Sequence, residues 1–206
     1  MGTNEELIMS PQLVFATNNR HKLEEVADKL NGAIRLLTLE DIGCTEDIAE
    51  TGSTFEENAS IKSHYVYDKY LLNCFGDDSG LEVDALNGEP GIYSARYADE
   101  HGNHQANMDK VLEKLASIEN RKARFVSVIS LIWNGSEHFF KGTVEGTLRR
   151  QRTGTGGFGY DPIFQPDGYA VTFAEMDLNE KNKISHRARA MTKLIEFLKN
   201  AGKTNR

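Results

Sequence analysis

The chain has 206 residues and a formal net charge of −7, with 39% hydrophobic and 27% charged residues. This length and balance suit one globular domain and exclude disordered and fibrous proteins. The acidic balance argues against a protein that binds nucleic acid through a broad basic face, so an anionic ligand must be met by a local basic cluster. No segment approaches the roughly 20 consecutive apolar residues of a membrane span.

Two sequence features bear on localisation. Cys44 and Cys74 have neither metal-ligand spacing nor a disulfide-rich context, which fits two buried thiols in a reducing cytoplasm. The first stretch, residues 1–11, is acidic and lacks the apolar core of a signal peptide, so we expect a flexible N-terminal tail. A cytoplasmic protein is therefore expected.

The N-terminal part predicts a strand, a tight loop and a helix. QLVFAT (12–17) has the pattern of a short buried strand, and apolar residues at helical spacing follow it as far as Gly32. A second helix is expected to begin within TGSTFEENA (51–59), where two overlapping Ser/Thr–Glu pairs have the spacing of a capping box. LLNCFG (71–76) then predicts a strand that ends just before a pair of aspartates.

The second half predicts a helix over 104–117 and a long β-hairpin. The apolar segments on either side of Asn134-Gly135 fit its two arms, because Asn-Gly is a strong signal for a two-residue hairpin turn. A glycine-dense loop, a short strand near VTFAEM (171–176) and a helix over about 179–199 complete the chain. The sheet should therefore be mixed and flanked by helices, in an α/β fold. Without repeats or linkers, 1–206 is expected to form one domain.

Six polar residues connect the first predicted strand to the first helix: Thr17, Asn18, Asn19, Arg20, His21 and Lys22. Unpaired N–H groups and the positive end of the helix dipole favour an anion at such a place, so this loop is a candidate phosphate site. The Walker A pattern is absent. The alternative is simple helix capping by Thr17 or Asn18 with solvated basic residues, and His21 alone is expected on the solvated surface.

Asp77 and Asp78 form the second candidate site, with Glu50 or the glutamates of 56–57 as partners. Adjacent carboxylates repel each other and are costly to bury together unless a cation or hydrogen-bond donors compensate. Oxygen ligands without nearby His or Cys favour Mg²⁺, which binds through one or two carboxylates plus substrate phosphates. The alternative is an aspartate turn with Gly80 at positive φ.

The third candidate site combines GGFGYDPIF (156–164) with EKNKISHRAR (180–189). The glycines allow the backbone to approach a flat ligand, and Phe158 or Tyr160 could stack on a base. Three side chains of the second segment supply donors that suit a 6-oxo purine and not a 6-amino group: Lys181, His186 and Arg187. The alternatives are a flexible glycine loop and a solvated helix face.

Taken together, the order of these motifs resembles a known family. The motifs are T-x-N-x-x-K after the first strand, ETGSTFEENA, DDSGLEVDALNGEPGIYSARY, GTGGFGYDP and KNKISHRARA. In this order they resemble the inosine triphosphate pyrophosphatase family, the XTP/dITP diphosphatases that remove aberrant purine nucleotides, over residues 12–198. The resemblance implies hydrolysis of ITP, dITP and XTP to the monophosphate and pyrophosphate, Mg²⁺ as cofactor, a homodimer, and an elongated fold whose two lobes flank a nucleotide cleft.

The resemblance also implies roles for individual residues. Asp78 would be the general base and a metal ligand, and Glu50 the second metal ligand, although many relatives carry two glutamates where this chain has Ala49-Glu50. The triphosphate would be held by Thr17, Asn18 and Lys22, in a loop whose Asn19-Arg20-His21 often aligns with smaller residues. Ser79 would lie beside the substrate. The base would be framed by Phe158, Gly159, Tyr160 and Asp161, and its oxo edge would be recognised by Lys181, His186 and Arg187.

Two other functions are compatible with these motifs. One is a related pyrophosphatase for another modified base, with pyrimidines or methylated purines as substrates. The other is a non-catalytic nucleotide-binding module, in which the aspartates only stabilise a turn.

Overall fold

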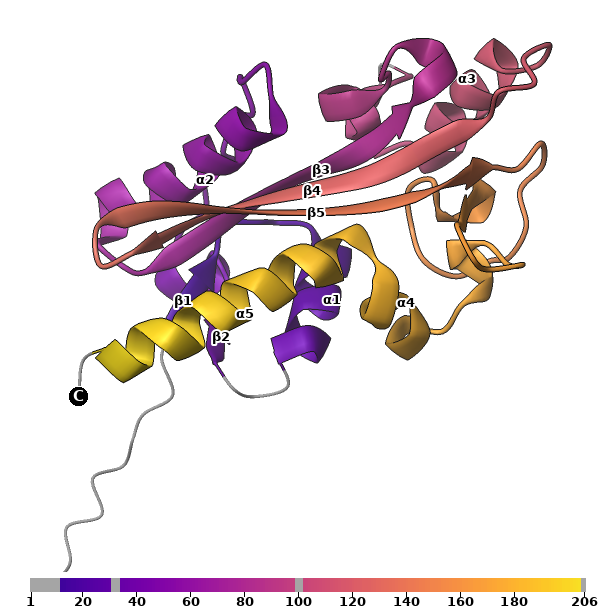
Figure 1. The fold of residues 1–206 in the computed structure, drawn as a ribbon. Coiled ribbons are helices and arrows are strands. Elements are labelled where there is room, and N and C mark those ends of the chain that lie inside the picture. Colours follow the sequence, from indigo (N-terminus) through magenta and orange to yellow (C-terminus); the bar gives the residue numbers. More distant parts are fainter. Residues whose placement is uncertain (1–11, 31–33, 99–101, 205–206) are drawn as a thin grey trace, which may run out of the picture.

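In a computed structural model that describes residues 12–30, 34–98 and 102–204, the chain forms one six-stranded sheet with helices on both faces (Figure 1). The strands, in the spatial order β2-β1-β3-β4-β5-β6, are β1 Gln12–Phe15, β2 Arg35–Leu37, β3 Cys74–Val83, β4 Lys122–Trp133, β5 Ser136–Leu148 and β6 Phe164–Pro166. The α-helices are α1 Arg20–Leu30, α2 Phe55–Tyr70, α3 His104–Lys114, α4 Leu178–Ile184 and α5 His186–Thr204. The predicted mixed α/β fold is confirmed. The tail expected at 1–11 and the helix end expected at Gly32 lie outside the described residues.

The sheet changes from parallel to antiparallel at β3. β1 runs parallel to β2 and to β3, whereas β3, β4, β5 and β6 pair antiparallel. The pairing of β1 with β3 ends at Phe15 opposite Phe75. Beyond this point no strand in the described ranges pairs with that edge of β3 from Gly76 to Leu81. A free edge next to the carboxyl end of a parallel strand is where open α/β sheets bind ligands.

The β4–β5 hairpin forms the long axis of the sheet (Figure 1). Its turn residues have positive φ, 50° at Asn134 and 79° at Gly135, and Trp133 pairs with Ser136 across the turn. Positive φ at both turn positions matches the twist of the flanking strands. The predicted hairpin is confirmed.

Helices cover the two faces of the sheet, with α2 on one face and α1 and α5 on the other (Figure 1). Phe75 of β3 packs in a cluster with residues of α1 and α5, whereas Cys74 packs in a cluster with residues of α2. Because successive side chains of a strand point to opposite faces, Asp77 falls on the face of Phe75 and Asp78 on the face of Cys74. The fold therefore separates two adjacent carboxylates. No helix in the described ranges is long and apolar enough to cross a membrane.

The predicted end of the third strand is wrong. β3 continues from Cys74 to Val83, so the two aspartates lie within it and pair with Ile129 and Val128 of β4. Gly80 has no positive φ, which rules out the aspartate-turn alternative. The strand continues because the long β4 arm offers backbone partners far away in sequence, and this pairing outweighs the poor strand propensity of Asp and Gly.

Two other predictions near the C-terminus are also wrong. The strand expected in VTFAEM is a 3₁₀ helix at Phe173–Glu175, begun by a capping box between Thr172 and Glu175. The single helix expected over about 179–199 is two helices, α4 and α5, because Ser185 adopts ψ 157° and breaks the helix between them. The break matters for the site, because Lys181 before it and His186 and Arg187 after it are all buried.

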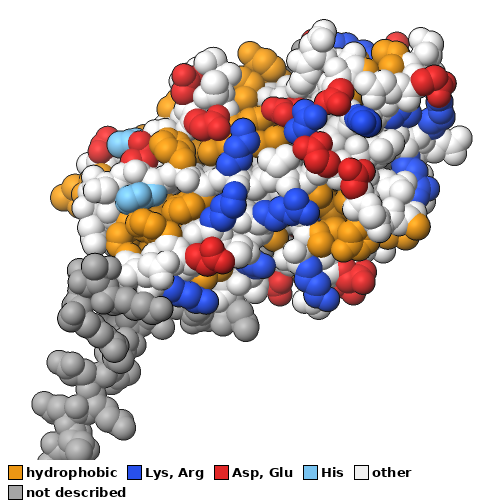
Figure 2. Space-filling model, in the orientation of Figure 1, with side chains coloured by type: hydrophobic (Ala, Val, Ile, Leu, Met, Phe, Trp, Pro, Cys, Tyr) orange, Lys and Arg blue, Asp and Glu red, His pale blue; other side chains and the backbone are white. Residues whose placement is uncertain are grey.

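Acidic and basic side chains are interspersed on the face shown in Figure 2, and no single basic patch covers it.

Near the α2 N-terminus, Thr54 is the N-cap residue, and its side chain accepts a hydrogen bond from the Glu57 N–H at 3.1 Å. This selects the Thr54/Glu57 pair from the two predicted capping-box pairs.

Candidate active site

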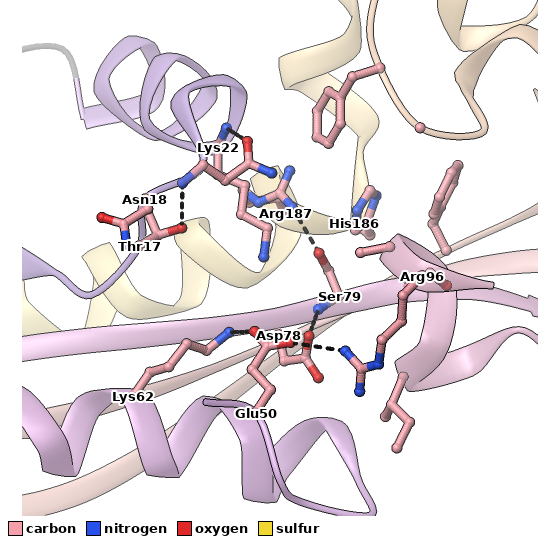
Figure 3. Close-up of a pocket in the computed structure, with 18 of the residues that line it drawn as sticks. Thr17, Asn18, Lys22, Glu50, Lys62, Asp78, Ser79, Arg96, His186 and Arg187 are labelled. Atoms are coloured by element: carbon pink, nitrogen blue, oxygen red, sulfur yellow. Dashed lines mark hydrogen bonds and ion pairs between the residues drawn. The ribbon is translucent and has the colours of Figure 1, made fainter. Parts of the chain in front are cut away.

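A cleft of about 350 Å³ lies at the free edge of β3 (Figure 3). Its walls come from the β1–α1 loop, residues 47–50, the middle of β3, the 3₁₀ helix Gly91–Arg96, the loop before β6 and the α4–α5 junction. These segments are far apart in the sequence. The pairing of β1 with β3 ends at Phe15, so the next part of the β3 edge stays open. The segments come together along this open edge.

Most of the predicted site residues line this cleft: Thr17, Asn18, Asn19, Lys22, Glu50, Asp78, Ser79, Phe158, Gly159, Tyr160, Asp161, Lys181, His186 and Arg187. Arg20 and His21 do not line it. Both are exposed on the first turn of α1, where they lie 3.5 Å and 3.8 Å from carboxylate oxygens of Glu24.

Side chains of the β1–α1 loop cap the start of α1. Asn19 is the residue before α1, and its side-chain oxygen accepts a hydrogen bond from the Lys22 N–H at 3.2 Å. Thr17 Oγ1 accepts from the Asn19 N–H at 3.1 Å. The helix is thus capped by Asn19, not by Thr17 or Asn18 as the capping alternative assumed, and the Asn18 side chain stays exposed at the cleft.

Asp77 is a buried structural carboxylate. Lys22 Nζ donates to Asp77 Oδ1 at 2.8 Å, and Arg187 Nε donates to Asp77 Oδ2 at 3.2 Å. Burial alone would raise the pKa of Asp77, but the positive charges of Lys22, Arg187 and Lys62 hold that pKa well below its usual range. Asp77 therefore ties α1 and α5 to the sheet and is not among the cleft-lining residues.

Asp78 faces the cleft from the next position of β3 (Figure 3). Its Oδ2 accepts from Asn58 Nδ2 at 3.0 Å, and its Oδ1 accepts from the Ser79 N–H at 2.9 Å. Burial raises the pKa of Asp78, against the opposing charges of Lys62 and Lys22. The result is an oriented carboxylate whose remaining lone pairs are open to a ligand.

Glu50 and Lys62 border Asp78 on the side of α2. Lys62 Nζ donates to Glu50 Oε1 at 2.5 Å and also to the main-chain oxygen of Asp77 on the free edge of β3. Burial would raise the pKa of Glu50, but the charge of Lys62 lowers it below its usual value. The Arg96 guanidinium lies 3.8 Å from the other Glu50 oxygen, across the cleft from the β1–α1 loop (Figure 3).

A second buried network supports the α4–α5 side. Glu25 of α1 accepts from Lys181 Nζ at 2.7 Å and from Arg187 Nη1, and Lys181 also donates to Asp161 Oδ2 at 2.7 Å. Burial opposes ionisation of Glu25, but Arg187 and Lys181 lower its pKa to about 2. Arg187 Nη2 reaches the cleft by donating to Ser79 Oγ at 2.9 Å.

Among the described residues that line the cleft, His186 carries a buried side-chain nitrogen without a hydrogen-bond partner. It is buried, its ring stacks on Phe125 at 4.7 Å between centroids, and its Nδ1 has no hydrogen-bond partner among the described residues. Burial and the charge of Arg187 lower the pKa of His186 well below its usual value, so the ring is neutral at pH 7. A buried ring nitrogen without a protein partner needs a bound water or a ligand group to satisfy it.

Sequence reasoning missed several residues of this site: Glu25, Asn58, Lys62 and Arg96. Two of these residues, Asn58 and Lys62, lie on α2, and a sequence signal for them exists. Asn58 and Lys62 fall at helical spacing within the stripe of Phe55, Ala59 and Val66, where polar residues must be paired if they are buried.

The fold and the cleft define an α/β protein in which carboxylates and basic side chains converge on one ligand site beside a helix N-terminus. The sequence profile of the Ham1 family matches residues 13–197, and the chain belongs to this family. The chain is 52% identical over 189 residues to the dITP/XTP pyrophosphatase of Flavobacterium psychrophilum, covering 92% of this chain and all of that protein. It is 51% identical to the dITP/XTP pyrophosphatase of Flavobacterium johnsoniae, over 91% of this chain and 97% of that one.

A solved structure agrees with this assignment. The Staphylococcus aureus Ham1 protein superposes with a TM-score of 0.84 at 41% identity, over 92% of this chain and 99% of that chain. The family resemblance inferred from the motifs is confirmed.

Proposed function

We propose that the protein hydrolyses dITP, XTP and ITP to the nucleoside monophosphate and pyrophosphate. The observation that carries the proposal is the position of Asp78, in one cleft with the β1–α1 loop and with the unpaired His186. The activity of the relatives, which are dITP/XTP pyrophosphatases, supports it. Such an enzyme removes aberrant purine nucleotides from the nucleotide pool.

The triphosphate binds at the β1–α1 loop. Thr17, Asn18 and Lys22 line the cleft beside the N-terminus of α1, where the helix dipole and basic side chains stabilise phosphate oxygens. Burial lowers the pKa of Lys22 from its usual high value, although Asp77 opposes the shift. Lys22 already has Asp77 as a partner, so a bound phosphate shares that ammonium group with the carboxylate.

Asp78 acts as the general base. Each oxygen of Asp78 accepts one hydrogen bond, Oδ2 from Asn58 and Oδ1 from the Ser79 N–H. The remaining lone pairs can take a proton from an attacking water. A pKa raised by burial improves the match between this carboxylate and its task, because a stronger base takes the proton more readily. Lys22 offsets negative charge on the phosphates as the bond to the pyrophosphate breaks.

The donor set fits Mg²⁺. Asp78 and Glu50 both face the cleft, and no group of three or more His, Cys, Asp and Glu side chains suited to a metal occurs in the described ranges. Two carboxylate ligands are enough for Mg²⁺ when substrate phosphates supply further oxygens. Bound there, Mg²⁺ would offset the charge of the phosphate oxygens. Glu50 would have to share its carboxylate between the ion and Lys62.

The base is recognised at the α4–α5 junction. Phe158 lines the cleft and offers a ring on which the base stacks, and Gly159, Tyr160 and Asp161 frame it. The oxo edge of the purine forms hydrogen bonds with the neutral His186 and with the N–H groups of Arg187 that remain free to donate. An adenine amino group placed there sets a donor against a donor, and such a buried mismatch rejects the wrong base.

The assembly and location of the protein are part of the same proposal. The family resemblance implies a homodimer whose protomer is one domain with two lobes, and the two thiols and the N-terminal stretch predict a cytoplasmic location. Light scattering coupled to size-exclusion chromatography would measure the molar mass, and a mass near 23 kDa instead of twice that value contradicts the dimer.

A product panel tests the activity. The protein is incubated with Mg²⁺ and dITP, XTP, ITP, ATP or GTP, and monophosphate, pyrophosphate and orthophosphate are quantified. Release of pyrophosphate with preference for the first three substrates is expected. Orthophosphate release, or equal turnover of ATP, contradicts the proposal. Pyrimidine and methylated purine triphosphates in the same panel identify the related pyrophosphatase, and binding without turnover identifies the non-catalytic module.

A further inference from the structure

His21 is exposed and does not line the cleft, yet its ring contacts a residue that does. The imidazole stacks on the phenyl ring of Phe158 with 5.1 Å between centroids and 11° between planes. His21 belongs to the first turn of α1, and Phe158 belongs to the loop between β5 and β6. The pair thus joins the wall that carries the phosphate-binding loop to the wall that carries the base-stacking ring.

The backbone around Phe158 has little support of its own. Gly157 and Gly159 have φ of 69° and 63°. The backbone of Phe158 is held by local hydrogen bonds to Asp161, from its N–H to Asp161 Oδ2 at 2.9 Å and from the Asp161 N–H to its main-chain oxygen at 3.2 Å. Gly157 cannot be replaced easily, because a Cβ there would lie 2.0 Å from Asp161 Oδ2. A half-buried ring on such a loop needs side-chain contacts to fix its orientation.

Four side chains contact the ring: Lys181, Arg187, His104 and His21. Lys181 Nζ lies 4.9 Å from the centre of the Phe158 ring and is itself fixed by Glu25 and Asp161. His21 adds the parallel stack. Offset stacking of two rings fixes their relative orientation beyond what burial alone provides.

We propose that His21 is a positioning residue for base recognition, which orients the Phe158 ring so that this ring can stack on the purine. The inference rests on the proposed function, because it assumes that Phe158 contacts the base. His21 itself acts only through Phe158 and touches neither the base nor the phosphates. A direct phosphate ligand at the same position would behave differently, and this difference can be measured.

The experiment compares His21→Ala and His21→Phe with the wild-type protein. KM and kcat are measured for dITP, and inorganic tripolyphosphate, which has no base, is measured as a competitive inhibitor. We expect His21→Ala to raise KM for dITP about 3- to 10-fold, with kcat and the inhibition constant of tripolyphosphate unchanged. His21→Phe keeps a planar ring and should restore KM.

Arg20→Ala is the matched control. Arg20 is exposed, lies on the same helical turn and contacts the same Glu24, but it is not among the described residues whose side chains contact the Phe158 ring. It should behave as the wild type. An unchanged KM in His21→Ala overturns the inference. So does a parallel loss of tripolyphosphate inhibition, which would make His21 a phosphate ligand, or a failure of His21→Phe to restore KM.

A double-mutant cycle adds the decisive readout. In a Phe158→Ala background, His21→Ala should have no further effect on KM, whereas additive effects would show that His21 acts independently of Phe158. If the wild-type protein binds dITP without hydrolysing it, the proposed pyrophosphatase activity fails, and the same cycle is measured by calorimetry as dissociation constants. If dITP does not bind at all, the inference about His21 fails as well.

Discussion

Asp77 and Asp78 are consecutive residues of β3, but their carboxylates lie on opposite faces of the sheet. Asp77 accepts hydrogen bonds from Lys22 and Arg187, whereas Asp78 accepts one from Asn58 of α2 and lines the cleft. The alternation of a strand therefore resolves the repulsion between two adjacent carboxylates, because each receives its own set of donors.

The first prediction concerns Asp78→Asn. Because an amide cannot accept the proton of the attacking water, kcat for dITP should fall by about two to four orders of magnitude. Substrate binding should persist, since the side chain keeps its size and its contact with Asn58 can be retained. Steady-state kinetics and calorimetric binding of dITP measure the two effects. Asp167→Asn, at an exposed position outside the cleft, is the control and should keep full turnover. Turnover that survives in Asp78→Asn would assign the base to another residue.

The second prediction concerns Asp77→Asn. The substitution leaves Lys22 and Arg187 without their shared buried anion, and removing one partner of a buried ion pair costs about 3–5 kcal/mol. The free energy of unfolding at pH 7, measured by urea denaturation, should fall by that order. Asp84→Asn removes a partner of Arg124 in a partly exposed ion pair and should cost less than about 1 kcal/mol. Equal losses in the two variants would mean that Asp77 is not a structural carboxylate.

Local patterns were sufficient to predict the elements that local interactions determine. The Asn134-Gly135 turn has the backbone that its sequence favours, and α2 begins at a capping residue predicted from spacing alone. The motif order also predicted which side chains meet, since the β1–α1 loop, Asp78 and the residues around Ser185 share one cleft.

The errors arise where distant partners decide the conformation. β3 runs past its aspartates because β4, about fifty residues later, supplies the hydrogen bonds. The break at Ser185 and the roles of Glu25 and Lys62 depend on tertiary contacts that no short motif encodes. The sequence signal for Lys62 is a charged residue at helical spacing within an apolar stripe, where a buried position requires a partner.

The third prediction follows from the pKa of Glu25. The folded-state pKa is about 2, below the unfolded value of 4.5, so ionised Glu25 stabilises the fold. This contribution is fully present above the unfolded pKa and is lost as the pH falls from about 4.5 towards 2. The free energy of unfolding of the wild type should therefore exceed that of Glu25→Gln at pH 7. This gap, the difference in the free energy of unfolding between the two proteins, should narrow below pH 4.5. A gap that stays constant down to pH 3 would contradict the ionised state of Glu25.

The fourth prediction concerns Mg²⁺ and Glu50. Chelation by EDTA should abolish hydrolysis of dITP, and added Mg²⁺ should restore it. Glu50→Gln removes one of two proposed ligands, so the Mg²⁺ concentration for half-maximal rate should rise about 10-fold or more. It also releases Lys62 from its carboxylate partner, so urea denaturation checks that the variant is folded.

The control for this prediction is Glu56→Gln, on the first turn of α2. Glu56 lies outside the cleft, 3.7 Å from Lys141, and its side chain is about half exposed. Its replacement should leave the Mg²⁺ requirement unchanged. If Glu50→Gln keeps the wild-type Mg²⁺ dependence while Asp78→Asn remains inactive, then Glu50 pairs with Lys62 and Arg96 only, and the ion is held by Asp78 and the substrate phosphates.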